Sequence, residues 1–119
     1  MSNGYLKECY ICETNKYDAL IKEVWNYLEV PASVILSYLP DEDKDRVFVQ
    51  ARVRIDEVET VKKVGTLSKE DSESILKYVA QGWKEVFDVR ICKADKKADE
   101  NKRFSIAIRI VQHPQEGIN

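Results

Sequence analysis

Two segments of this sequence alternate aliphatic and polar residues along their whole length. They are RVFVQARVRI at 46–55 and RFSIAIRIV at 103–111. Because successive side chains of a β-strand point to opposite faces, this period of two predicts strands with one aliphatic and one polar face. A sheet of such strands must bury its aliphatic face against other elements, so the pattern requires a layered or closed β-containing core.

Three more segments predict strands, which polar loops join. Of these, 87–93 alternates in the same way, 34–39 is apolar on nearly both faces, and 5–12 has a weaker pattern. The strands are expected at 5–12, 34–39 and 87–93, and the loops at 40–45 and 93–102. The stretch EVETVKKVG at 57–65 is compatible with an extension of the preceding strand, a separate strand or a loop. The pattern leaves these three alternatives open.

Two segments repeat apolar residues at the spacing of an α-helix. The first covers 15–29, with Asn15 as its expected N-cap and Pro31 just beyond its end. The second covers 69–86, with Ser68 as its expected N-cap. Both helices carry an apolar stripe, so both should pack on the sheet.

The expected order of elements is therefore β-α-β-β-α-β-β. The 119 residues are the size of one domain, so we expect a single α+β domain over 1–119 with a flexible tail at about 112–119. Two helices on one face of a mainly antiparallel sheet of four to five strands would form a two-layer sandwich. The first six elements correspond to a ferredoxin-like arrangement, to which an extra C-terminal strand is added.

Composition and charge argue against several classes of function. The net charge is −2, whereas a nucleic-acid partner usually requires a basic surface. No apolar run approaches the roughly 20 residues of a membrane span, and the start MSNGYLKE has no apolar signal core. We therefore expect a cytoplasmic protein that does not associate with membranes.

The cysteines do not form a recognisable metal or redox motif. Cys9 and Cys12 form a CxxC pair, and the other soft ligands are Cys92 and the single histidine, His113. A structural zinc site requires four ligands at compact spacing, and a thioredoxin-type motif requires its CxxC at a helix N-terminus. The acidic loop at 41–45 lacks the glycine and glutamate of a calcium-binding loop. We expect free thiols, no metal and no cofactor.

Catalytic motifs are equally hard to find. The sequence has no serine elbow, phosphate-binding glycine loop or HExxH motif, and its four glycines are far apart. The 21 acidic residues single out no catalytic pair. A small enzyme without a recognisable motif is therefore the third hypothesis.

The distribution of arginine is the most informative feature. All six arginines lie in the alternating segments at 46–55, 87–93 and 103–111, whereas the lysines lie outside these three segments, apart from Lys93 at one margin. Arginine makes fixed, directional contacts and is enriched with aromatic residues at protein interfaces. The polar face of the sheet would carry a candidate binding set: Arg46, Phe48, Gln50, Arg52, Arg54, Arg90, Arg103 and Arg109.

The first hypothesis is a non-catalytic interaction domain. It would bind a protein partner, or itself as a homo-oligomer, through this arginine-bearing face or an exposed strand edge. The alternative is a domain that binds single-stranded nucleic acid on the same face, by stacking on Phe48 and phosphate contacts. A purely structural explanation is that the arginines pair with acids across strands and cover the sheet with their stems.

Overall fold

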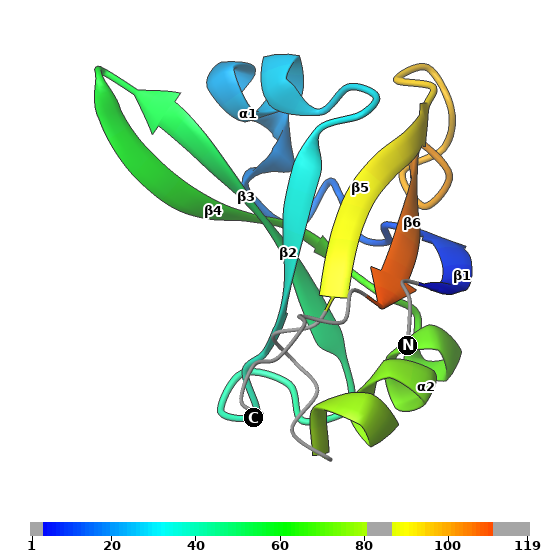
Figure 1. Ribbon diagram of the computed structural model, residues 1–119. Coiled ribbons are helices and arrows are strands. Elements are labelled where there is room, and N and C mark those ends of the chain that lie inside the picture. The colour runs from blue at the N-terminus through cyan, green and yellow to red at the C-terminus, as the bar shows by residue number, and fades with distance from the viewer. Residues whose placement is uncertain (1–3, 81–86, 111–119) are drawn as a thin grey trace, which may run out of the picture.

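The computed structural model describes residues 4–80 and 87–110, which form one six-stranded sheet, two α-helices and a short 3-10 helix (Figure 1). The strands are β1 (Gly4–Tyr10), β2 (Ser33–Tyr38), β3 (Val47–Ile55), β4 (Val58–Thr66), β5 (Phe87–Ala94) and β6 (Phe104–Ile110). The helices are η1 (Asp18–Leu20, 3-10), α1 (Lys22–Tyr27) and α2 (Lys69–Ala80). The expected tail at 112–119 and the expected end of the second helix at 81–86 lie outside the described residues.

The strand order is β1-β6-β5-β2-β3-β4, and every neighbouring pair is antiparallel. The α+β class and the antiparallel sheet are confirmed. The sheet has six strands instead of the expected four to five, because 58–66 forms β4 as a strand of its own. The ferredoxin-like arrangement is not confirmed, since a split βαβ unit needs parallel neighbours and the described strand pairs are all antiparallel.

The chain just after β1 meets the end of β4 and closes one end of the sheet. The Cys12 N–H donates to Thr66 O at 2.7 Å, and the Thr66 N–H donates to Cys12 O at 2.9 Å. A Cβ atom on Gly65 would lie 2.4 Å from Cys12 O and 2.5 Å from Ile11 Cγ2. Glycine therefore allows the two backbones to approach, and the contact joins the two edges of the sheet at one point, which gives a partly closed barrel.

The helices cover opposite ends of this barrel and do not share one face of a flat sheet as expected. In Figure 1, α1 lies above the strands, where it packs against β3, and α2 lies below them. The second helix begins as predicted, because the Asp71 N–H donates to Ser68 Oγ at 3.0 Å. A curled sheet encloses its own aliphatic face, so the helices are left to cover the ends.

The first helix is much shorter than the predicted 15–29. Asn15 does not cap it, because its Oδ1 accepts a hydrogen bond from Arg103 Nη1 at 2.7 Å. The helical turns are further divided at Ile21, whose ψ of 135° is extended and separates η1 from α1. Tertiary contacts of the segment before η1 thus override the helical periodicity of the sequence.

A single hydrophobic core fills the barrel. The aliphatic faces predicted for the two alternating segments supply much of it, and the core-cluster residues from these segments are Val47, Val49, Ala51, Val53, Phe104, Ile106 and Ile108. Val24, Leu28 and Ile75 join this core from the α1 and α2 regions. In residues 4–80 and 87–110, no helix is long and apolar enough to cross a membrane.

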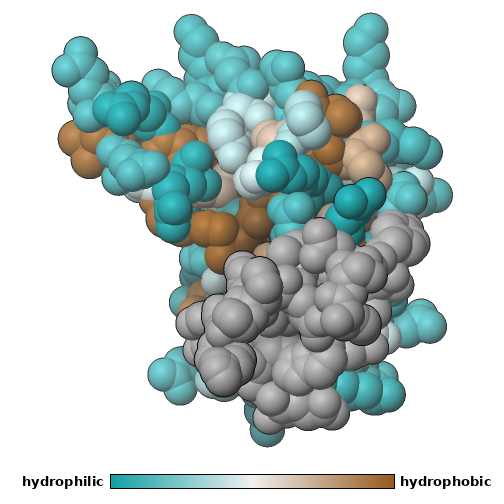
Figure 2. Space-filling view, viewed as in Figure 1, coloured by the Kyte–Doolittle hydropathy of each residue, from teal (hydrophilic) through white to brown (hydrophobic). Residues whose placement is uncertain are grey.

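The far half of the β3–β4 hairpin projects beyond the barrel (Figure 1). Asp56 and Glu57 form its two-residue turn, with φ of 53° and 65°, the positive values of a type I′ turn. The β2 strand pairs with β3 only as far as Gln50. On β4, Val58 and Val61 are 62% and 45% exposed, and Figure 2 shows hydrophobic surface over this part of the molecule.

Candidate functional site

Two of the eight predicted binding residues, Arg46 and Arg103, hold the segment that follows β1. Arg46 Nη1 lies 2.8 Å from Glu13 Oε1 and donates to Thr66 Oγ1 at 3.3 Å. Arg103 donates to Thr14 Oγ1 and Asn15 Oδ1, at 3.3 Å and 2.7 Å. Both guanidinium groups are therefore occupied by contacts that fix the fold.

Phe48 and Gln50 lie on the predicted outward face of β3, but neither is freely available. The Phe48 side chain is only 1% exposed, because the Tyr17 ring packs edge-on against it at 5.8 Å between centroids. The Lys63 ammonium lies 5.2 Å from the same ring. Gln50 is half-buried and accepts a hydrogen bond from Ser37 Oγ at 2.6 Å.

Arg90 and Arg109 are exposed on β5 and β6. Arg90 Nε lies 3.3 Å from Asp88 Oδ1, within the same strand. Arg109 stands opposite Asp88 in the strand register and forms no ion pair with another described residue. One carboxylate thus lies between the two arginines and offsets part of their charge.

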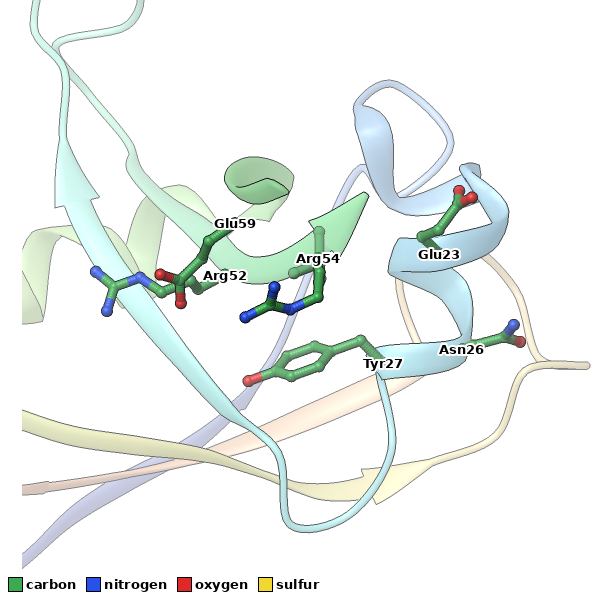
Figure 3. A pocket seen from close by; sticks show the side chains of 7 residues that line it. Glu23, Asn26, Tyr27, Arg52, Arg54 and Glu59 are labelled. Atoms are coloured by element: carbon green, nitrogen blue, oxygen red, sulfur yellow. The ribbon is translucent and has the colours of Figure 1, made fainter. Parts of the chain in front are cut away.

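The remaining two arginines, Arg52 and Arg54, lie on the projecting half of β3 and line a pocket of about 450 Å³ (Figure 3). We call it the arginine pocket, and its lining residues are Glu23, Asn26, Tyr27, Arg52, Val53, Arg54 and Glu59. It lies between β3 and α1, with Glu59 added from β4.

Both guanidinium groups of the arginine pocket are available to a ligand. Arg52 and Arg54 are exposed, and neither forms an ion pair with any residue in the described part of the chain. Among the described residues, Arg54 Nη1 donates only to the carbonyl of Glu57 in the hairpin turn, at 3.3 Å. The Tyr27 hydroxyl donates to Ser33 O at 2.6 Å, which fixes the position of that ring in the wall.

The arginine pocket also contains two carboxylates, those of Glu23 and Glu59. Its formal charges therefore balance, and a compact polyanion gains no net attraction there. An elongated ligand can instead place acidic groups beside the arginines and polar groups beside α1. The sequence identified the two arginines but gave no sign of Glu23, Asn26 or Tyr27, because α1 lies beside β3 only in the folded chain.

Cys9, Cys12 and Cys92 are free thiols. Burial raises the pKa of Cys9 to about 12 and also raises the pKa of Cys12. Partial burial and a hydrogen bond to Glu8 raise the pKa of the exposed Cys92. The three thiols are thus protonated at neutral pH, which makes them weak nucleophiles.

No group of three metal-ligating side chains occurs within 4–80 and 87–110. The Cys9 thiol lies in the hydrophobic core, whereas Cys92 is bonded to Glu8 and Ser105 O on the outward side. The sheet therefore separates these two candidate ligands. His113, the fourth candidate, lies outside the described residues.

Comparisons with protein-family models, with curated protein sequences and with solved structures find no match to this chain.

Proposed function

We propose that this chain is a non-catalytic interaction domain that binds a protein partner through the arginine pocket. The observation that carries the proposal is the pair Arg52 and Arg54. These two exposed guanidinium groups lie on the same side of one strand and in one pocket, and neither has a carboxylate partner among residues 4–80 and 87–110. Exposed arginines that lie near an aromatic ring, here Tyr27, are frequent anchors of protein interfaces. The pocket volume also falls within the usual range of ligand sites.

Two features favour a protein partner over single-stranded nucleic acid. The aromatic residue expected to stack on bases, Phe48, is covered by Tyr17 and presents no open ring face. The two arginines of the pocket stand beside Glu23 and Glu59, which would repel a continuous phosphate backbone.

The proposal can be tested by selecting ligands from a random peptide library displayed on phage. Peptides selected on the wild-type protein would be synthesised, and their Kd measured on two variants that lose the same charge. The variant Arg52→Ser/Arg54→Ser should bind at least about tenfold more weakly, as expected for the loss of interface arginines. The control Arg90→Ser/Arg109→Ser should bind like the wild type, because these arginines lie on β5 and β6.

Three results would contradict the proposal. One is a selection that enriches no peptide, and another is equal binding by the two double variants. The third is salt-sensitive binding of a fluorescent single-stranded oligonucleotide that Arg52→Ser/Arg54→Ser abolishes, which would assign the pocket to nucleic acid. Circular dichroism of each variant confirms that the fold is retained.

A further inference from the structure

The projecting half of β3 has a free backbone edge on the side of α1. In a hairpin with a two-residue turn, the residues flanking the turn form a hydrogen-bonded pair, and such pairs then alternate along the strands. Ile55 and Val58 flank this turn, so Val53 and Ala51 also bond to β4. The Leu67 N–H donates to Val47 O at 2.9 Å, which confirms that odd-numbered residues of β3 face the β4 side.

The backbone N–H and C=O groups of Arg52 and Arg54 consequently point away from β4. They face the position beside β3 that β2 would occupy if it continued in the same direction. The β2 strand leaves this line after its pair Ile35–Gln50, and pairs instead with β5 through Ser33 and Val34. In the described part of the chain, the strand register pairs Arg52 and Arg54 with β4 only, and no strand is paired with them on the other side. Four strong hydrogen-bonding groups thus border the arginine pocket.

From this we infer that the arginine pocket receives an extended peptide segment of a partner protein as an added antiparallel strand, which continues the line of β2 beside β3. The inference rests on the proposed function and specifies the form of its ligand. Main-chain bonds to Arg52 and Arg54 supply affinity in this mode of recognition, and the alternating side chains of the peptide supply specificity.

The register determines the chemistry of the bound segment. Peptide residues directly opposite Arg52 and Arg54 place their side chains on the same face as these guanidinium groups, where acidic residues fit best. The residue between them faces the side of Val53, on which α1 packs, because Val53 belongs to the same core cluster as Val24 and Leu28. The favoured sequence is therefore acidic–apolar–acidic in an extended conformation.

The charges of the pocket support this occupant. Two guanidinium groups lie on the outward face of β3, so two acidic side chains spaced by one residue match them. Glu23 and Glu59 leave the pocket without net positive charge, which disfavours a free phosphate or a long polyanion. An uncharged apolar residue between the two acids avoids further repulsion next to α1.

The test uses a synthetic probe, acetyl-Ser-Thr-Glu-Val-Glu-Thr-Ser-amide, and amide hydrogen exchange of the full chain by NMR. The amides of Arg52 and Arg54 should exchange quickly in the free protein and slow at least about tenfold with saturating probe. The amide of Val53 is the internal control, because it bonds to β4 in both states. Slowed exchange confined to these positions would identify main-chain pairing.

Methylated probes make the test independent of protein folding. An N-methyl group on either glutamate removes a donor that points at β3 and should weaken binding at least about tenfold. An N-methyl group on the valine points away from β3 and should leave the Kd nearly unchanged. A probe with glutamine at both acidic positions should bind more weakly, since it loses the charge-assisted contacts.

The outcomes separate this inference from the proposed function. If the probe binds and depends on Arg52 and Arg54, but their amides stay unprotected and N-methylation of glutamate has no effect, side-chain contacts alone bind the peptide. The strand-addition inference would then be wrong and the proposed function would stand. Failure of the probe to bind also overturns the inference, whereas the library selection still decides the proposed function.

Discussion

The two halves of β3 carry the same alternating pattern but lie in different surroundings. In the first half, Val47, Phe48 and Val49 are buried on both faces of the strand. In the second half, Val53 is buried while its neighbours Arg52 and Arg54 are exposed. Alternation therefore sets the direction of each side chain, but a distant segment of the chain decides whether the outward face is covered.

The cover over the first half comes from the residues between β1 and η1. Glu13 pairs with Arg46, the residue just before β3, and Tyr17 packs on Phe48 within β3. They reach this position because the chain after β1 is bonded to β4 at Cys12 and Thr66. No described residue covers the second half in the same way, and Arg52 and Arg54 form no ion pair there with a described carboxylate.

The largest expected effect tests the covered half. Phe48→Ala should destabilise the protein by about 3–5 kcal/mol, because it empties a fully buried site against Tyr17. Arg52→Ala, on the same face of the same strand, should cost less than about 1 kcal/mol. Urea denaturation of the two variants measures the difference. Equal, small losses would show that Tyr17 does not cover Phe48 in solution.

A smaller effect should follow from disturbing the contact between Gly65 on β4 and the chain after β1. Gly65→Ala places a Cβ against Cys12 O and should cost about 1–3 kcal/mol, since a backbone neighbour cannot move aside without breaking the barrel contact. Val61→Ala, at an exposed site of the same strand, serves as the control and should change stability by less than about 0.5 kcal/mol. If Gly65→Ala matches this control in urea denaturation, the close approach is not a constraint.

The sequence predicted the strands because period-two alternation is a local property, and the core positions of β3 and β6 follow directly from it. It predicted the start of α2 for the same reason, since Ser68 bonds to a residue three positions away. The prediction that a helix begins at Asn15 was wrong, because Asn15 bonds to Arg103 and α1 begins only at Lys22. Contacts between such distant residues leave no local pattern.

In the candidate site, too, the local pattern predicts some residues and only tertiary contacts bring in the others. Arg52 and Arg54 were identified because their strand alternates, whereas Tyr27 and Glu23 meet them only through tertiary packing of α1. Arg46 and Arg103 have the same local pattern as the exposed arginines, yet both bind the segment after β1. The stretch at 57–65 was ambiguous because half of β4 projects beyond the core and needs no aliphatic face.

The smallest expected effect comes from a substitution in the turn of the projecting β3–β4 hairpin, and it should raise the stability of the protein. Glu57 has a φ of 65°, a left-handed conformation that disfavours a residue with a Cβ. Glu57→Gly removes this strain and completes the Asp-Gly pair preferred in type I′ turns, although glycine also gains freedom in the unfolded chain. We expect a net stabilisation of about 0.5 kcal/mol, measured as a higher urea midpoint with an unchanged slope.

Asp56→Gly is the matched control and should gain less, because aspartate tolerates positive φ better than glutamate. The Glu57 carbonyl that accepts from Arg54 survives the substitution, so binding of the acidic probe should not change. A loss of stability in Glu57→Gly would show that the turn has another conformation in solution, which would contradict the hydrogen-bond alternation that frees the backbone groups of Arg52 and Arg54.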